Sequence, residues 1–211
     1  MKPGWSGRHL IRYTSQMRNC LIWLSASRAA PLVLLTLGVG LACVEGANDK
    51  PAPEDLELIK KNLLGSAPAP HFRANANIAD KVVYLGLDVS PVPLAPGRTV
   101  TLTHYWQVKE PPGKEWRMFV HAQGPAGAGR MNLDHGAVQD KYPASKWKAG
   151  DIVRDEHTFQ LPASFSQATL EIYVGLWRGG ERMPVKSGPH DQNGRVLAAT
   201  IPVKAGSSRM R

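Results

Sequence analysis

Residues 116–123 read Trp116-Arg-Met-Phe-Val-His-Ala-Gln123, and residues 169–177 read Thr169-Leu-Glu-Ile-Tyr-Val-Gly-Leu-Trp177. In both segments every second side chain is aliphatic or small, which is typical of a β-strand with one face turned to a core. Residues 98–108 alternate in the same way, with Val100 and Trp106 marking the side that we expect to be buried.

Further strands are expected at residues 81–89, 151–161 and 196–203. In the first of these, Val83, Leu85, Leu87 and Val89 are expected to share one face. The chain has 20 Gly and 17 Pro, which punctuate these short segments and leave little room for helices between them. The pattern predicts an all-β fold, a two-sheet antiparallel sandwich of immunoglobulin-like or jelly-roll-like type with one short N-terminal helix.

That helix is expected at residues 54–64, because Pro53 suits its first turn and acidic and basic residues stand at its two ends. Its apolar face, Leu56, Ile59 and Leu63, is expected to dock on the domain; binding to a partner is the alternative. We therefore expect a Pro/Ala-rich tether over residues 44–80, with residues 66–79 as a loop. The sandwich is expected at 81–204, followed by a disordered tail at 205–211.

Residues 29–44 are uncharged and mostly apolar, and basic residues precede them. This is the layout of an export signal, so we interpret residues 1–43 as a signal peptide or membrane anchor. The segment Gly40-Leu-Ala-Cys43 resembles a bacterial lipobox, which makes Cys43 the candidate for lipidation. The alternatives are an ordinary export signal and an uncleaved anchor. The resemblance implies an exported, membrane-anchored protein at the outer membrane or the periplasmic face of the envelope.

The net charge of +9 does not indicate nucleic-acid binding. Residues 1–43 hold five bases and no acid, which leaves 21 bases against 17 acids in residues 44–211, and no basic run is interleaved with aromatic residues. The two cysteines, Cys20 and Cys43, both precede the predicted sandwich, which therefore has no thiolate chemistry. Nothing in the sequence calls for a cofactor.

The residues with the most reactive side chains are His121, Asp134, His135, Asp155 and His157. Their spacing matches no catalytic or metal-ligand motif, so we assign no catalytic residue and no metal site. The alternatives are a polysaccharide-acting hydrolase or a metal-binding protein that uses Asp134, His135 and Asp155. In the simplest interpretation, the two aspartates fix loops by accepting backbone N–H bonds and pairing with arginines.

Aromatic side chains provide a second candidate site. Tyr105, Tyr173 and Trp177 are expected to face outward and Trp147 to lie on a loop, an arrangement that would give sugar rings a stacking platform. The alternative, which we favour for Trp147, is burial in the core. The ligand-binding candidates are Tyr105, His121, Asp134, His135, Trp147, Tyr173 and Trp177.

Five short motifs over residues 82–203 resemble a bacterial extracytoplasmic β-sandwich module, found in the soluble C-terminal regions of membrane proteins similar to dolichyl-phosphate-mannose-type glycosyltransferases. They are Phe119-Val-His121, Asp134-His135, Tyr142-Pro-Ala-Ser-Lys-Trp147, Gly150-Asp-Ile-Val-Arg-Asp155 and Val174-Gly-Leu-Trp177. The membrane-embedded catalytic part of those proteins has no counterpart here, so the resemblance implies an accessory module and no transferase activity.

These observations favour a noncatalytic, envelope-anchored module that binds a glycan or an envelope protein. Its membrane contact would be the N-terminal segment or an attached lipid. A purely structural envelope role that uses the helix face is a further alternative.

The intact mass of the protein purified from bacterial membranes tests the N-terminal interpretation. We expect a mass that matches residues 43–211 plus a diacylglyceryl and an acyl group. A full-length mass would show an uncleaved anchor, and a truncated but unmodified mass would show an ordinary secreted protein.

Overall fold

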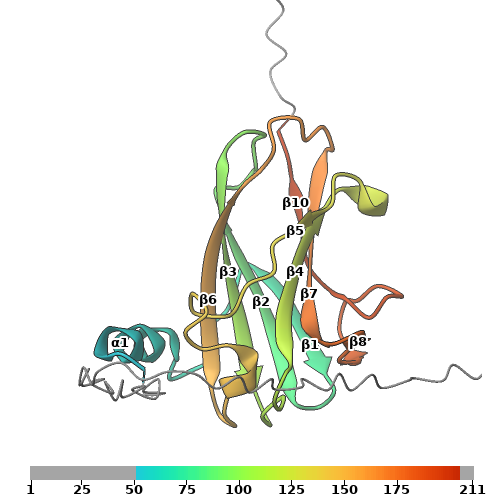
Figure 1. The fold of residues 1–211 in the computed structure, drawn as a ribbon. Helices are drawn as coiled ribbons and strands as arrows, with labels where there is room; N and C mark the ends of the chain where they lie inside the picture. The colour runs from blue at the N-terminus through green and yellow to red at the C-terminus, as the bar shows by residue number, and fades with distance from the viewer. Residues whose placement is uncertain (1–50, 205–211) are drawn as a thin grey trace, which may run out of the picture. The chain divides into compact units, whose positions relative to one another are not determined.

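The computed structural model describes residues 51–204, which form two antiparallel sheets packed face to face (Figure 1). The first sheet has the strand order β6-β3-β2-β1-β9, and the second has the order β10-β7-β4-β5 with β8 paired to β7. The predicted two-sheet sandwich is therefore confirmed. The predicted leader with Cys43, the first part of the tether and the C-terminal tail lie outside the described residues.

The elements follow one another with few helical turns between the strands. They are α1 (Pro53–Asn62), β1 (Phe72–Ile78), β2 (Val82–Ser90), β3 (Thr99–Val108), β4 (Arg117–Gln123), η1 (Pro125–Gly127), β5 (Met131–Asn132), η2 (Ala144–Lys146), β6 (Ile152–Gln160), β7 (Thr169–Arg178), β8 (Glu181–Arg182), β9 (Val185–Ser187) and β10 (Val196–Pro202). Among residues 51–204, no helix is both long and apolar enough to span a bilayer.

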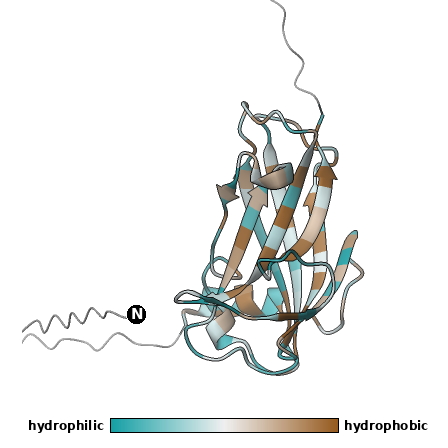
Figure 2. Ribbon diagram, turned by 90° about the vertical axis from the view of Figure 1, so that its right-hand side faces the viewer, coloured by the Kyte–Doolittle hydropathy of each residue, from teal (hydrophilic) through white to brown (hydrophobic). Residues whose placement is uncertain are grey.

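The core lies between the two sheets and is filled by the alternating residues that the sequence pattern indicates. Leu102 and Trp106 of β3 meet Val120 of β4 and Ile172 and Leu176 of β7, and all five are fully buried. Figure 2 shows this alternation of apolar and polar residues along the strands. Burial of apolar area on this scale is the main stabilising contribution to such a fold.

One strand of the first sheet was not predicted. Residues 72–78, Phe-Arg-Ala-Asn-Ala-Asn-Ile, form β1, which pairs with β2 and contributes Ala74, Ala76 and Ile78 to the core. The sandwich therefore begins near residue 72 instead of 81. Ala and Asn have low strand propensity, and here pairing with a neighbouring strand outweighs that preference.

A bulge in β2 also changes the expected facing of that strand. The register shifts between Tyr84 and Gly86, so Val82, Tyr84 and Leu87 enter the main core, whereas Val83 and Leu85 face the opposite side. Gly86 has φ of 150°, and a Cβ there would lie 2.2 Å from the carbonyl oxygen of Phe72. Only glycine permits this close approach of β1 and β2.

Helix α1 docks against β6. Ile59 and Leu63 pack on the core, Leu64 N–H donates to the carbonyl of Ile152 at 2.8 Å, and Lys141 pairs with Asp55 at 2.9 Å. Leu56 remains 51% exposed. Most of the apolar face is therefore covered by the domain, and the helix ends at Asn62, two residues earlier than expected.

The segment between β5 and β6, residues 133–151, runs across the opening between the two sheets, as the yellow loop in Figure 1 shows; we call it the crossing loop. Ala137, Val138 and Trp147 of this segment are buried in the core. The indole N–H of Trp147 donates to the carbonyl of Tyr142 at 2.9 Å, and its ring lies 5.6 Å from that of Trp106. The segment therefore closes one side of the sandwich, and its other residues are held beside β6.

Two Leu→Ala substitutions test the placement of the core. We expect Leu102→Ala, at a fully buried position, to lower the free energy of unfolding by about 2–5 kcal/mol, since it removes packed methyl groups and leaves a cavity. Leu56→Ala, at the exposed helix position, should change it by less than about 0.5 kcal/mol. Urea denaturation followed by tryptophan fluorescence measures both, and equal effects would contradict this placement of the core and the helix.

Candidate functional site

The five reactive residues singled out by the sequence separate into two clusters. His135, Asp155 and His157 lie together at the open side of the sandwich, beside β6. His121 and Asp134 lie on the outer face of the second sheet, where His121 Nε2 is 3.7 Å from Asp134 Oδ1. The single set of Asp134, His135 and Asp155 proposed for a hydrolase is not assembled.

Asp155 is the best-held side chain of the first cluster, and it is fully buried. Its Oδ1 accepts the backbone N–H of Val138 at 2.8 Å, and its Oδ2 lies 2.8 Å from His135 Nε2. The other ring nitrogen of His135 is 2.8 Å from the carbonyl oxygen of Leu133. As expected for the simplest interpretation, Asp155 fixes a loop; its charged partner, however, is His135 rather than an arginine.

The charges of this pair stabilise each other. Burial disfavours protonation of His135, but the hydrogen bond and the charge of Asp155 outweigh it, so the pKa of His135 is raised. Burial likewise disfavours ionised Asp155, but the hydrogen bond and charge of His135 outweigh that effect, and the pKa of Asp155 is lowered.

One further histidine, His104, extends this cluster into the core. His104, opposite Asp155 in the pairing of β3 with β6, stacks on His157 with ring centroids 5.4 Å apart. The ring of His135 is 4.0 Å from that of His157. His104 Nδ1 contacts the hydroxyl of Tyr84 at 2.8 Å, whereas His104 Nε2 and both ring nitrogens of His157 are buried with no hydrogen-bond partner among residues 51–204.

Burial lowers the pKa of His104 to about 3, with a further contribution from His157. Burial and the neighbouring His135 lower the pKa of His157 to about 4. Both rings are therefore neutral at pH 7, and one nitrogen of His157 has a free lone pair.

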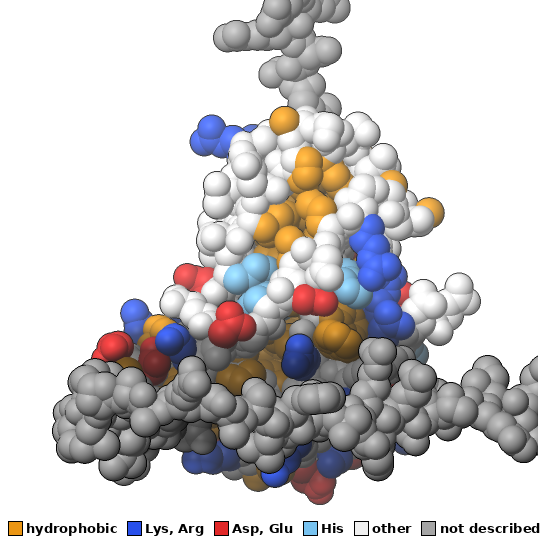
Figure 3. Space-filling model, in the orientation of Figure 1, with side chains coloured by type: hydrophobic (Ala, Val, Ile, Leu, Met, Phe, Trp, Pro, Cys, Tyr) orange, Lys and Arg blue, Asp and Glu red, His pale blue; other side chains and the backbone are white. Residues whose placement is uncertain are grey.

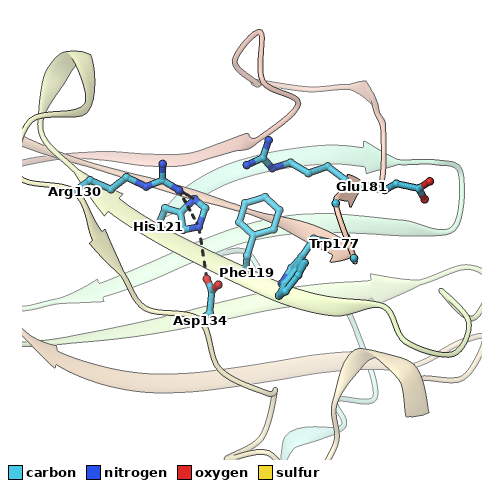
Figure 4. Close-up of a pocket in the computed structure, with 9 residues that line it drawn as sticks. Phe119, His121, Arg130, Asp134, Trp177 and Glu181 are labelled. Carbon is cyan, nitrogen blue, oxygen red and sulfur yellow. Dashed lines mark hydrogen bonds and ion pairs between the residues drawn. The ribbon is translucent and has the colours of Figure 1, made fainter. Parts of the chain in front are cut away.

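The second cluster forms part of a groove on the outer face of the second sheet, which we call the outer groove (Figure 4). It has a volume of about 290 Å³. Phe119 and His121 of β4 line it with rings 4.9 Å apart, and Trp177 of β7 lies beside them. The ring of Phe119 covers Gly175 on the neighbouring strand, where a Cβ would lie 2.6 Å from it. The Phe119 ring can therefore occupy this position because Gly175 has no side chain.

Charged side chains surround this aromatic floor. Arg130 Nη2 lies 3.1 Å from His121 Nδ1, and burial together with the Arg130 charge lowers the pKa of His121. Asp134 Oδ1 accepts the backbone N–H of Val120 at 2.9 Å. On the other side, the guanidinium of Arg182 lies over the Phe119 ring at 5.6 Å from its centroid, and Glu181 stands at the end of the groove.

The expected single platform of four aromatic residues does not form. Tyr105 is nearly buried on the outer face of the first sheet, where its hydroxyl donates to Asp88 at 2.9 Å. Trp147 is in the core, 2% exposed, which is the alternative that the sequence favoured for it. Tyr173 is on the same face as the outer groove, but the guanidinium of Arg195 covers its ring at 4.1 Å. Of the predicted ligand-binding residues, the outer groove brings together His121, Asp134 and Trp177.

Several residues of these sites were not selected from the sequence. Arg130 directly precedes β5 and Arg182 ends the short strand β8, and no motif marks either of them. Phe119 was part of a quoted motif but was not selected as a site residue. His104 was recognised as facing the core, but its place beside Asp155 depends on the pairing of strands about fifty residues apart. The alternation of Arg117, Phe119 and His121 was the one signal that an aromatic row follows the outer face of β4.

A scan against protein-family models gave no match, and a search of curated protein sequences gave none. Among solved structures, the chain is similar to a Niemann-Pick type C2 protein from the Japanese carpenter ant, with 8% sequence identity and a TM-score of 0.35. The similarity covers 57% of this chain and 89% of the other.

The neutral histidines predict an acid-sensitive fold. The unfolded chain binds protons at these two positions below about pH 6.5, whereas folded His104 and His157 bind them only near pH 3 and 4. Stability is therefore lost as the pH falls from 6.5 to 4. Because each ring contributes about 1.4 kcal/mol per pH unit over this range, we expect a loss on the order of 6 kcal/mol. The raised pKa of His135 acts on the alkaline side, since its contribution is complete below pH 6.5 and is lost as the pH rises through its folded value.

Urea denaturation at a series of pH values measures this slope. His157→Leu removes one of the neutral rings without breaking a hydrogen bond, and it should flatten the decline between pH 6.5 and 4. A slope identical to that of the unsubstituted protein would contradict the assignment.

Proposed function

We propose that this chain is a noncatalytic binding module of the bacterial envelope, and that it holds a glycan in the outer groove. The observation that carries the proposal is the combination of an aromatic floor, Phe119 and Trp177, with charged hydrogen-bonding groups on both sides of it.

The aromatic floor suits the apolar side of a sugar ring. The axial C–H groups of a pyranose form a flat, weakly positive surface, which is attracted to the negative face of an aromatic ring. Trp177 is partly exposed beside the groove, whereas Phe119 is almost completely buried. Trp177 is therefore the side chain that provides most of the stacking surface, and Phe119 supports it.

The charged groups suit the hydroxyls of the same ring. A sugar hydroxyl both donates and accepts, and carboxylate–guanidinium surroundings offer both kinds of partner. Asp134 uses one oxygen on the N–H of Val120, and its other oxygen remains an acceptor. Arg130 and Arg182 supply N–H donors from opposite sides of the groove. Hydroxyls spaced around one ring can reach both sides.

The size of the groove limits what it holds. At about 290 Å³ it lies at the lower end of the range for small-molecule sites, roughly 300–1,000 Å³. It therefore accepts one unit of a longer chain, and its ends remain open for the units on either side.

Export and anchoring complete the proposal. The apolar segment at residues 29–44 and the lipobox-like Cys43 would place the module at the envelope, where bacterial glycans are exposed to it. This setting also agrees with the sequence resemblance to accessory modules of envelope glycosyltransferase-like proteins. An envelope protein is the other class of ligand, and Leu56 is an exposed apolar side chain that such a partner would contact.

Binding to an array of bacterial cell-wall and surface oligosaccharides tests the glycan proposal, with calorimetry on the strongest binder. We expect Trp177→Ala to weaken binding at least tenfold, because it removes the stacking surface. Asp134→Asn should weaken it less, since an asparagine oxygen can still accept the N–H of Val120.

The matched control is Trp116→Ala. Trp116 is also partly exposed and contacts an arginine, with the guanidinium of Arg178 at 4.8 Å, but it does not line the outer groove. The proposal is wrong if the folded protein binds no oligosaccharide on the array, or if Trp116→Ala and Trp177→Ala weaken binding equally.

A further inference from the structure

A second surface groove lies at the open side of the sandwich. Its volume is about 460 Å³, and we call it the edge groove. His135 and His157 line it, and Asp155 lies directly behind His135. These histidines are different from the one that lines the outer groove. Figure 3 shows histidine side chains that reach the surface on this side of the domain, with acidic side chains next to them.

Three potential ligand atoms converge at this place. One nitrogen each of His135 and His157 and one carboxylate oxygen of Asp155 all lie within 4.8 Å of one another. They come from two segments of the chain, since Asp155 and His157 are two residues apart on one face of β6 and His135 comes from the crossing loop. Strand spacing and a loop held by two hydrogen bonds thus bring the set together.

The nitrogens of His157 have an unusual environment. Both are buried, and neither has a hydrogen-bond partner among the described residues. A buried polar group without a partner destabilises a fold, so such groups in a folded protein call for an explanation. Behind His157, the fully buried His104 also leaves its Nε2 without a partner. Two stacked histidine rings therefore have three nitrogens without a partner among the described residues.

We propose that His135, Asp155 and His157 form a binding site for one divalent transition-metal ion, of which Zn²⁺ is the representative. Two imidazoles and a carboxylate form a donor set that suits zinc and its neighbours in the first transition series, and not Mg²⁺ or Ca²⁺, which prefer oxygen ligands. This proposal does not depend on the glycan proposal.

The surroundings of the three ligands match those of known metal sites. A ligating histidine commonly donates its second N–H to a carbonyl or carboxylate, which orients the ring. His135 has this arrangement, with Nδ1 at 2.8 Å from the carbonyl oxygen of Leu133 and Nε2 turned toward Asp155. Asp155 in turn is oriented by the N–H of Val138.

Metal binding requires only small movements. Two ligands of a tetrahedral zinc ion lie about 3.4 Å apart when each bond is near 2.1 Å. His135 Nε2 and Asp155 Oδ2, now 2.8 Å apart, would separate by roughly half an ångström, and His157 would approach. No hydrogen bond within the described residues holds the His157 ring in place. Entry is through the edge groove, where Asp140 and Glu156 add negative charge at its mouth.

Calorimetric titration of ZnCl₂ into the full chain tests the proposal, after EDTA treatment and removal of EDTA, and with Cys20 and Cys43 alkylated so that thiolates do not compete. We expect one Zn²⁺ per chain, a raised melting temperature with Zn²⁺ and no effect of Mg²⁺. His157→Leu should weaken binding more than about 100-fold, because it removes a ligand. It breaks no hydrogen bond, so its circular dichroism spectrum should remain native.

The matched control is His71→Leu, which removes an exposed histidine that does not line the edge groove and should leave zinc binding unchanged. Trp177→Ala, in the outer groove, should also bind zinc normally, so the two proposals can fail separately. Absence of zinc binding by the folded protein overturns the proposal, as does equal binding by the unsubstituted protein and His157→Leu. Equal weakening by His71→Leu would show adventitious surface binding and would also overturn it.

Discussion

The fully buried carboxylate of Asp155 fixes the crossing loop to β6. One oxygen binds the N–H of Val138 and the other binds His135, so a single side chain of β6 holds both ends of a short stretch of the crossing loop. That loop carries Ala137, Val138 and Trp147 into the core, where they close the side of the sandwich between the two sheets. Removal of one partner from such a buried pair typically costs about 3–5 kcal/mol, because the other charge is left without compensation. The apolar contacts of the loop and the charge pair therefore depend on each other.

The same carboxylate explains why three histidines are tolerated next to the core. His104 and His157 are neutral and stacked, so neither brings a charge into a region of low dielectric. Only His135, which has access to the edge groove, forms the charged partner of Asp155. The ring nitrogens of His157 nevertheless have no hydrogen-bond partner among the described residues. A well-packed apolar residue at that position would avoid the free-energy cost of burying them. A ligand for those nitrogens gives a physical reason for histidine there.

How far the sequence predicts this structure depends on whether a feature is local. The alternation in residues 98–108, 116–123 and 169–177 is local, and the core residues it indicates, Leu102 and Val120 among them, are buried as predicted. β1 was missed because Ala and Asn give no strand signal, and its pairing with β2 is decided by the rest of the sheet. The reversal of facing within β2 follows from a bulge at Gly86, and a bulge has no signature in period-two alternation.

The candidate sites also depend on non-local contacts, which the sequence does not reveal. The sequence selects His121, Asp134, His135, Asp155 and His157 as one group, but it cannot show that Asp134 and His135, although adjacent, serve different clusters. Asp134 turns to the outer groove beside His121, and His135 turns to Asp155 in the interior. The backbone at this point is fixed from both sides, by the bond from Val120 N–H to Asp134 and by the bonds of His135 to Leu133 and Asp155. The two neighbours are therefore held by opposite sheets, and the two grooves share this one fixed point of the crossing loop.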